Sequence, residues 1–208
     1  DRFILSKGHA CLALYGALVE KNLLKKSDLE TFESDGSKLL GHPIINKLSG
    51  IEFSTGSLGM GLSLGVGVAL AAKLKKKKYK TFVVIGDGEC NEGSIWESIL
   101  SANHFKLDNI TIIVDRNNFQ QTGKSSSIMD LKNLKNKFKS FGCETTEVDG
   151  HDIKKIYDSL KRKNINNKPK VIVAKTIKGK GFKLFENNND WHHSVITKSI
   201  YKEILKEL

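Results

Sequence analysis

The chain has 208 residues, of which 39% are hydrophobic and 27% charged, and its formal net charge is +11. This length suffices to bury a core without disulfide or metal crosslinks. The 3 cysteines are an odd number without a CxxC pair, which argues against a disulfide framework or a zinc site and indicates a reducing, cytoplasmic compartment. The basic excess comes from 31 lysines and only 3 arginines, so a solvated lysine-rich surface is favoured over a nucleic-acid interface.

The first extended apolar segment, residues 53–72, carries no charge and matches a membrane span in length. It also contains five glycines and three serines, which lower its mean hydropathy. A helix that is apolar all round is equally typical of the core of a large soluble domain. We therefore expect a buried helix here and no membrane partner.

Further along the chain, β-branched apolar runs alternate with helical periodicity. The runs Thr81–Ile85, Ile110–Val114 and Val171–Ala174 are typical of strands buried on both faces of a parallel sheet. The segments Glu92–Phe105 and Ile153–Leu160 place apolar residues at helical spacing. This alternation predicts an α/β fold in which helices flank both faces of a central, mostly parallel sheet.

The last segment, Val195–Leu208, places isoleucine or leucine at every fourth position from Ile196 to its end. This spacing predicts a terminal amphipathic helix that covers the core. Neither an internal repeat nor a linker interrupts the chain, so we expect one domain over residues 1–208.

Polar residues follow two of the predicted strands. Gly86-Asp87-Gly88 follows the first, and Asn117 follows the second, thirty residues after Asp87. Ligands of parallel sheets lie beyond the carboxyl ends of the strands, so Asp87 and Asn117 converge if these strands are neighbours. One carboxylate, one amide oxygen and one backbone carbonyl suit Mg²⁺, with diphosphate oxygens and a water completing its octahedron. Asp115 either orients Asn117 or caps a loop.

Six stretches of the sequence resemble, in order, the motifs of the transketolase family. The stretch 86–97, together with Asn117, resembles the family's thiamine-diphosphate motif. The other stretches are DRFILSKGH at 1–9, GHP at 41–43, STGSLGMG at 54–61, VDGHD at 148–152 and KTIKG at 175–179. The resemblance is collinear from Asp1 to about Ser194, and chance does not account for six ordered motifs.

The resemblance implies the diphosphate-binding (PP) domain of transketolase, with thiamine diphosphate and Mg²⁺ as cofactors and Ca²⁺ or Mn²⁺ as substitutes for the metal. It implies that Asp87, Asn117 and the carbonyl oxygen of Phe119 bind the metal. The residues implied to contact the cofactor are His9, Gly56, Ser57, Leu58, Gly86, Asp87, Gly88, Glu89, Asn117 and His192.

The resemblance also implies a transferase that moves a two-carbon ketol unit from a ketose phosphate to an aldose phosphate, as in the pentose phosphate pathway. His42 and His192 would face the substrate and move protons. His193 follows directly, and the register of the motif favours His192 over it. Glu92 resembles the family's buried glutamate, which links the two active sites of a dimer. Gln121 stands where the family frequently has an aliphatic residue.

The family's pyrimidine-binding (Pyr) domain, whose glutamate activates the cofactor, has no counterpart in this sequence, and neither do several dozen residues upstream of Asp1. We therefore expect the N-terminal subunit of a split transketolase, active with a Pyr subunit in a dimer of PP/Pyr pairs. The alternatives are the PP portion of a related thiamine enzyme, such as a deoxyxylulose-phosphate synthase, and a non-catalytic cofactor-binding remnant. Asn91-Glu92-Gly93 favours transketolase, since the synthase usually lacks this glutamate.

Overall fold

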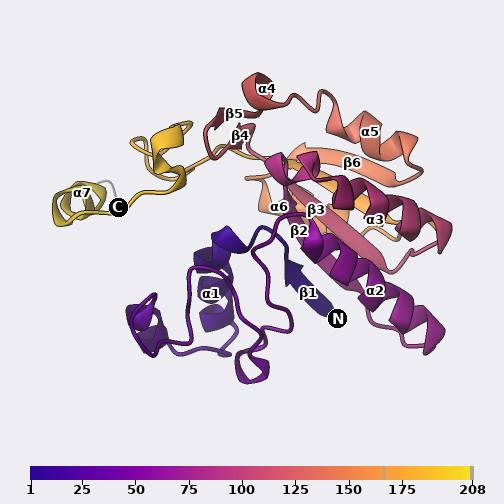
Figure 1. Ribbon diagram of the computed structural model, residues 1–208, viewed down its shortest axis with the longest axis horizontal. Helices are drawn as coiled ribbons and strands as arrows, with labels where there is room; N and C mark the ends of the chain where they lie inside the picture. The colour runs from indigo at the N-terminus through magenta and orange to yellow at the C-terminus, as the bar shows by residue number, and fades with distance from the viewer. Residues whose placement is uncertain (166, 207–208) are drawn as a thin grey trace.

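A five-stranded parallel sheet forms the centre of the molecule, whose computed structural model describes residues 1–165 and 167–206 (Figure 1). Its strand order is β1-β2-β3-β7-β6, and every neighbouring pair runs parallel. The strands are β1 (Arg2–Leu5), β2 (Thr81–Gly86), β3 (Ile110–Arg116), β6 (Glu144–Asp149) and β7 (Lys170–Lys175). A short antiparallel hairpin, β4 (Phe119–Gln120) with β5 (Gly123–Lys124), follows β3.

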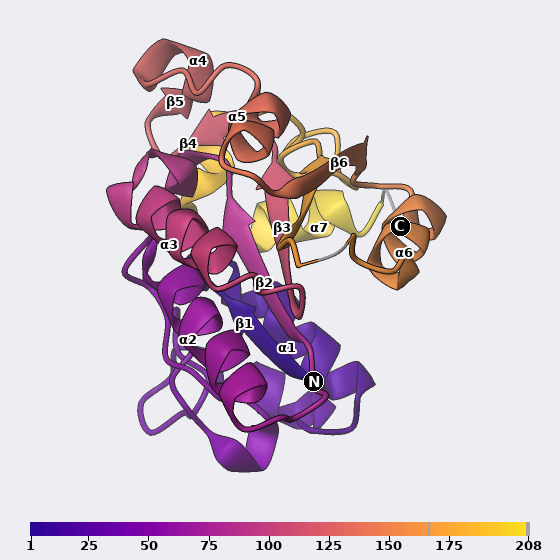
Figure 2. The same cartoon turned by 90° about the vertical axis from the view of Figure 1, so that its right-hand side faces the viewer.

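Helices cover both faces of this sheet, which confirms the predicted fold class. In Figure 2, α2 and α3 lie side by side on one face, and α6 lies on the opposite face, against β6. The helices are α1 (Cys11–Glu20), α2 (Met60–Leu74), α3 (Gly93–His104), α4 (Ser125–Ile128), α5 (Leu134–Ser140), α6 (Ile153–Lys161) and α7 (Lys198–Ile204). The 3₁₀ turns are η1 (Gly8–Ala10), η2 (Lys26–Thr31), η3 (Lys47–Ser49), η4 (Gly88–Asn91) and η5 (Asn189–His192).

The three apolar runs predicted as strands form β2, β3 and β7, each within two residues of its predicted ends. Their buried character is clearest in β7, where residues 170–174 are all buried. Two strands carried no such signal. The sequence of β6, ETTEVD, is mostly polar, and β1 has only four residues at the start of the chain. Both occupy the edges of the sheet, where one neighbour suffices to fix a strand.

The uncharged segment 53–72 leads into and mostly forms α2, as predicted. This helix buries a stripe that includes Leu62, Gly65 and Ala69 against β1 and β2. Within the described part of the chain, no helix is long and apolar enough to cross a membrane. The glycines decide how closely α2 approaches the sheet: a Cβ at Gly61 would lie 2.7 Å from the Ser6 Cα, so only glycine fits there.

Two separate clusters of buried apolar side chains support the fold. The larger cluster lies between the sheet and the helices α2, α3 and α5, and includes Val83, Ile112 and Phe138. The smaller cluster surrounds Tyr15 on α1 and holds the segment between α1 and η3. Tyr15 donates its hydroxyl hydrogen bond to the Leu40 carbonyl oxygen at 2.7 Å. The three cysteines are buried and unpaired.

The terminal helix α7 is shorter than predicted and does not cover the core. It begins at Lys198, after Thr197 caps it, and ends at Ile204. Ile204 is buried but belongs to neither apolar cluster, and in Figure 1 α7 lies at the far left, apart from the sheet. The prediction that this helix covers the core was therefore wrong, and Leu208 lies outside the described residues.

Two glycines of α2 allow a matched test of this packing. We expect Gly61→Ala to lower the free energy of unfolding by about 2 kcal/mol, because the new methyl group meets the backbone of Ser6. Gly67→Ala, on the same helix, has no neighbour within 4 Å and should raise it by about 1 kcal/mol through helix propensity. Urea denaturation of both variants checks this, and equal effects would contradict the packing described.

Candidate functional site

The loops after β2 and β3 meet at the carboxyl edge of the sheet. Asp87 follows β2, and its Oδ2 accepts hydrogen bonds from the Asn118 N–H at 2.9 Å and the Ser125 hydroxyl at 3.3 Å. The neighbouring Asn117 accepts, through Oδ1, a hydrogen bond from the Phe119 N–H at 2.9 Å. Asn118 has the left-handed φ of +64° that turns this loop back onto Asp87. The structure thus brings together the two loops on which the metal ligands were predicted.

Asp87 is a buried carboxylate, 5% exposed, and no salt bridge among the described residues involves it. Burial raises its pKa above the ordinary value, although the hydrogen bonds from Asn118, Gly88 and Ser125 oppose this shift. Such a group is stabilised by a cation. The described residues contain no cluster of three or more His, Cys, Asp or Glu side chains suited to a metal. A magnesium-type site, with one carboxylate, an amide oxygen and a carbonyl, does not need one.

A second acidic residue at this edge, Asp115, is already neutralised. Its Oδ2 lies 2.6 Å from the ammonium of Lys7, which follows β1, and its Oδ1 accepts a hydrogen bond from Thr176, which follows β7. Burial alone would raise the pKa of Asp115, but Lys7 and Thr176 hold it below the ordinary value. Asp115 therefore links three strand ends rather than orienting Asn117, with which no hydrogen bond is formed.

Histidines from two distant segments meet above this edge. His9 in η1 and His192 in η5 stack with their ring centroids 5.6 Å apart. The Lys178 ammonium lies 3.0 Å from His192 Nδ1. His9 is exposed as a residue, but partial desolvation of its ring, together with the charge of Lys7, lowers its pKa to about 4. Burial and the charge of Lys178 lower the pKa of His192. Both rings are therefore neutral at pH 7, and His192 rather than its exposed neighbour His193 takes part in the pair.

The loop before α2 forms the third wall. Gly56, with φ +152°, lies against the His42 ring, whose Cδ2 would be 3.0 Å from a Cβ at that position. A Cβ at Gly8 would lie 2.9 Å from the backbone of Thr55 and Gly56, so the two loops stack backbone on backbone. Ser57 and Leu58 are exposed. We call this edge, formed by the segment after β1, the loop Gly56–Gly59 and the segment after β2, the cradle. Its glycines have no side chains, which fits a cofactor that must approach the main chain closely.

The η5 turn is held over the same edge by the hairpin after β3. Asn189 donates from Nδ2 to the Gln121 carbonyl oxygen at 2.8 Å, which positions the turn that carries His192. Gln120 packs its side chain against Gly88, where a Cβ would lie 2.9 Å from Gln120 Cγ. Its Nε2 is buried without a hydrogen-bond partner among the described residues. An unsatisfied donor beside Gly88 is a further feature that suits a bound anion.

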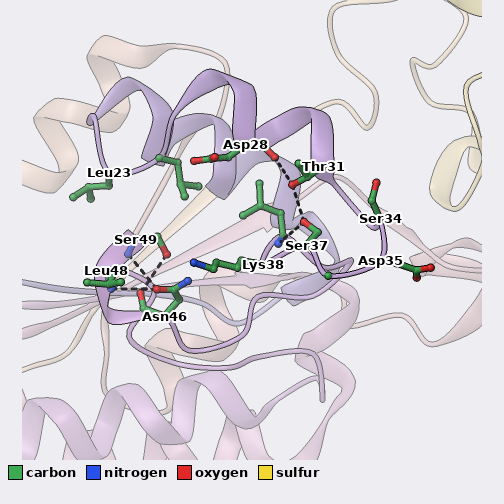
Figure 3. A pocket seen from close by; sticks show the side chains of 13 residues that line it. Leu23, Asp28, Thr31, Ser34, Asp35, Ser37, Lys38, Asn46, Leu48 and Ser49 are labelled. Atoms are coloured by element: carbon green, nitrogen blue, oxygen red, sulfur yellow. Dashed lines mark hydrogen bonds between the residues drawn. The ribbon is translucent and has the colours of Figure 1, made fainter.

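A cavity of about 440 Å³ elsewhere in the molecule is not part of this site (Figure 3). It is lined by residues of η2, of η3 and of the loops around them, among them Leu23, Lys38 and Asn46. Several of its polar side chains form local hydrogen bonds: Asn46 caps η3, and Thr31 bonds to the Asp28 carbonyl oxygen and to the Ser37 hydroxyl. We therefore interpret this cavity as a gap between local turns and not as a ligand site.

Comparison with known proteins agrees with this geometry. The profile of the family described as "Transketolase, thiamine diphosphate binding domain" matches residues 1–207. The chain belongs to the transketolase family. An apulose-4-phosphate transketolase subunit from Phocaeicola vulgatus is 41% identical over 100% of this chain and 74% of its own length. The 6-deoxy-6-sulfo-D-fructose transketolase subunit of Clostridium sp. is 36% identical, over 100% and 76%.

Solved transketolases share the fold as well. The crystal structure of transketolase from Campylobacter jejuni superposes with a TM-score of 0.90 at 32% identity, covering 100% of this chain and 34% of that enzyme. The chain thus spans about a third of that transketolase and about three quarters of the two bacterial subunits. The predicted family and the role as one component of a split transketolase are confirmed, and the alternatives of a synthase or a remnant are not favoured.

Two glutamates named in the sequence analysis have contrasting surroundings. Glu92 is exposed in this chain and directly precedes α3. Its burial between the two active sites of a dimer stays a prediction. Glu89, predicted to contact the cofactor, is 3% exposed, and both its carboxylate oxygens bond to protein groups. It therefore supports the cradle from within rather than lining it.

Three polar residues of the site were not singled out from the sequence. Lys7 and Lys178 lie inside motifs that were quoted for the resemblance, SKGH and KTIKG, so the signal was present. Thr176 also lies in the second motif. Their importance depends on contacts between strand ends that are up to 108 residues apart in the sequence, as for Lys7 and Asp115, and no local pattern reports these.

The Lys7–Asp115 pair can be tested by stability. Asp115→Asn leaves a buried ammonium without its counter-charge, and we expect a loss of about 3 kcal/mol in the free energy of unfolding. The double variant Lys7→Met/Asp115→Asn should recover part of that loss. Glu52→Gln, which breaks the more exposed pair with Arg2, should cost less than about 1 kcal/mol. Equal losses for the two single variants would contradict the burial of the Lys7 pair.

The lowered pKa of His9 predicts a pH dependence. In the unfolded chain His9 titrates near the ordinary value of 6.5, whereas in the folded chain its pKa is about 4. The unfolded state therefore binds more protons between these values, and folding stability falls as pH decreases from 6.5 towards 4. We expect the thermal unfolding midpoint of His9→Asn to fall less over this pH range than that of the wild type. A midpoint near 6.5 for His9 in an NMR titration would contradict the prediction.

Proposed function

We propose that this chain is a single PP domain over residues 1–208 that binds thiamine diphosphate and Mg²⁺ at the carboxyl edge of its sheet. In this proposal it joins a Pyr partner to form a cytoplasmic transketolase built as a dimer of PP/Pyr pairs. The observation that carries the proposal is Asp87, a buried carboxylate without a cationic partner among the described residues, in contact with the loop of Asn117. The nearby histidines and Lys178 supply an environment for an anion.

In the proposed site, Asp87, Asn117 and the carbonyl oxygen of Phe119 hold Mg²⁺, with Ca²⁺ or Mn²⁺ as substitutes. The raised pKa of Asp87 supports this, because a bound divalent cation would stabilise the charged carboxylate. Asn117 already presents its Oδ1 to the turn that carries Phe119. Hard cations of this kind prefer oxygen ligands and tolerate few protein groups when phosphates supply the rest.

The diphosphate would lie between Lys178 and the backbone of the cradle. Gly56 and Gly88 are half-buried and have no side chain to separate the main chain from a ligand, and Ser57 and Leu58 are exposed nearby. Thiamine diphosphate, when bound, supplies the carbanion chemistry that accepts and releases the two-carbon unit. The chain's own groups bind, orient and exclude water.

His42 and His192 are the proposed proton-transferring groups on the substrate side. The pKa of His192 is lowered, so at pH 7 its ring is neutral and able to exchange a proton. The Lys178 ammonium can only donate, so it fixes His192 Nδ1 as the acceptor and leaves Nε2 to carry the proton. This orientation directs one N–H group away from Lys178.

The proposed substrates are a ketose phosphate donor and an aldose phosphate acceptor, as in the pentose phosphate pathway. The relatives support the class of chemistry, since one is named for apulose-4-phosphate and another for a sulfonated fructose. A Pyr partner is supported by exposed apolar side chains on α2 and α3, namely Met60, Leu64 and Leu100. Exposed apolar patches of this kind mark surfaces that bind a partner.

The central test is cofactor binding by Asp87→Ala. We expect the wild type to quench its tryptophan fluorescence on titration with thiamine diphosphate and Mg²⁺, and to transfer a ketol unit once a candidate Pyr subunit is added. Asp87→Ala should weaken Mg²⁺-dependent binding by about 100-fold, the loss expected for a removed metal ligand.

The matched control is Asp108→Ala, since Asp108 is an acid near the opposite end of β3 that pairs with Lys73. It should bind like the wild type. Retained Mg²⁺-dependent affinity in Asp87→Ala would overturn the ligand assignment. A complex that binds the cofactor but transfers nothing would overturn the proposed enzyme.

A further inference from the structure

Glu89 is the most extensively bonded buried acid in the described chain. Its Oε1 accepts a hydrogen bond from the Gly59 N–H at 2.8 Å and another from the Ser6 hydroxyl, and its Oε2 accepts one from the Gly86 N–H at 3.0 Å. No Lys, Arg or His pairs with it among the described salt bridges. Three neutral donors therefore converge on one carboxylate.

The three donors come from the three segments that build the cradle. Ser6 directly follows β1 and precedes Lys7 and the η1 turn that carries His9. Gly59 ends the loop of Gly56, Ser57 and Leu58 and caps α2 with φ +83°. Gly86 ends β2, one residue before Asp87. Glu89 is the one described side chain that hydrogen-bonds to all three segments.

These contacts leave little freedom to the backbone around them. A Cβ at Gly59 would lie 2.8 Å from Glu92 Cβ, and one at Gly61 would lie 2.7 Å from Ser6 Cα. The N-terminus of α2 and the end of β1 are therefore in direct backbone contact, and Glu89 fills the space between them and β2. A carboxylate that accepts only from N–H and O–H groups is well satisfied in its ionised form.

We propose that Glu89 is a positioning residue for the cofactor: its carboxylate fixes the β1 end, the Gly56–Gly59 loop and the β2 end relative to one another, so that His9, the loop backbone and Asp87 meet one ligand. The inference rests on the proposed function, because it assumes that the cradle binds thiamine diphosphate. Glu89 itself does not touch the ligand, since its oxygens are bonded to protein groups.

The critical variant is Glu89→Gln, which has the same shape but replaces one accepting oxygen with a donor. The amide NH₂ of this glutamine must take the place of one carboxylate oxygen. It then faces either the Gly86 N–H or the Gly59 N–H, so an N–H donor points at another donor. We expect the Kd for thiamine diphosphate at saturating Mg²⁺ to rise by about 10-fold or more, as for other residues that orient ligands. With saturating cofactor and the Pyr subunit, kcat should change by less than about threefold, since the residues proposed to move protons remain in place.

The matched control is Glu144→Gln. Glu144 is also a buried glutamate, 7% exposed, and it accepts from Arg162 and from the Ile165 N–H at 2.7 Å. It begins β6 at the opposite end of the sheet, so Glu144→Gln should lower the thermal midpoint while leaving the cofactor Kd within about twofold of the wild type. Ser6→Ala removes one of the three donors and should raise the Kd by a smaller factor of about three.

The outcomes separate the two proposals. If the wild type does not bind thiamine diphosphate, the proposed function fails. If the wild type binds and Glu89→Gln binds equally well, or if Glu144→Gln weakens binding as much, Glu89 is not a positioning residue. Should Glu89→Gln fail to fold, Ser6→Ala decides: an unchanged Kd overturns the inference, and a Kd raised with unchanged kcat supports it.

Discussion

The parallel register of β1, β2, β3 and β7 is the constraint on which the site depends. Because all four strands run the same way, the residue that follows each one emerges at the same edge of the sheet. Side chains from the start, the middle and the later part of the chain are thereby brought within hydrogen-bonding distance. One antiparallel strand among the four would send its following residue to the opposite edge.

At this edge three acids, of which Asp87 and Glu89 are buried and Asp115 is half-buried, have their charges compensated differently. Asp115 is neutralised by Lys7, and its pKa is lowered. Glu89 is satisfied by neutral N–H and O–H donors on both oxygens. Asp87 receives neutral donors on Oδ2, yet its pKa is raised. Of the three, Asp87 is therefore the one whose charge is least compensated, which supports the proposal that a cation binds there.

The sequence predicted most of the sheet, because β2, β3 and β7 are short, continuous runs of β-branched apolar residues. Such runs are typical of strands whose two faces are both covered by helices. It did not predict β6, because the sequence of this strand is mostly polar and carries no apolar pattern. Only its parallel pairing with β7 in the structure identifies it as a strand. At the site, motifs located Asp87, Asn117 and the histidines, and the structure places these residues together at one edge. The role of Glu89 was inaccessible, because its partners lie 83 and 30 residues away and the donors are mostly backbone groups that any residue provides.

The two apolar clusters are separate, so the parts of the site that they support differ in stability. His42 follows directly after the segment that the small cluster around Tyr15 and Leu39 secures, whereas Asp87 and Asn117 are anchored in the large cluster of the sheet. A small cluster with few buried side chains opens at lower free energy than a sheet core. Such a partial opening would displace His42 while the loops of Asp87 and Asn117 stay folded, so these two parts of the candidate site can lose their order independently.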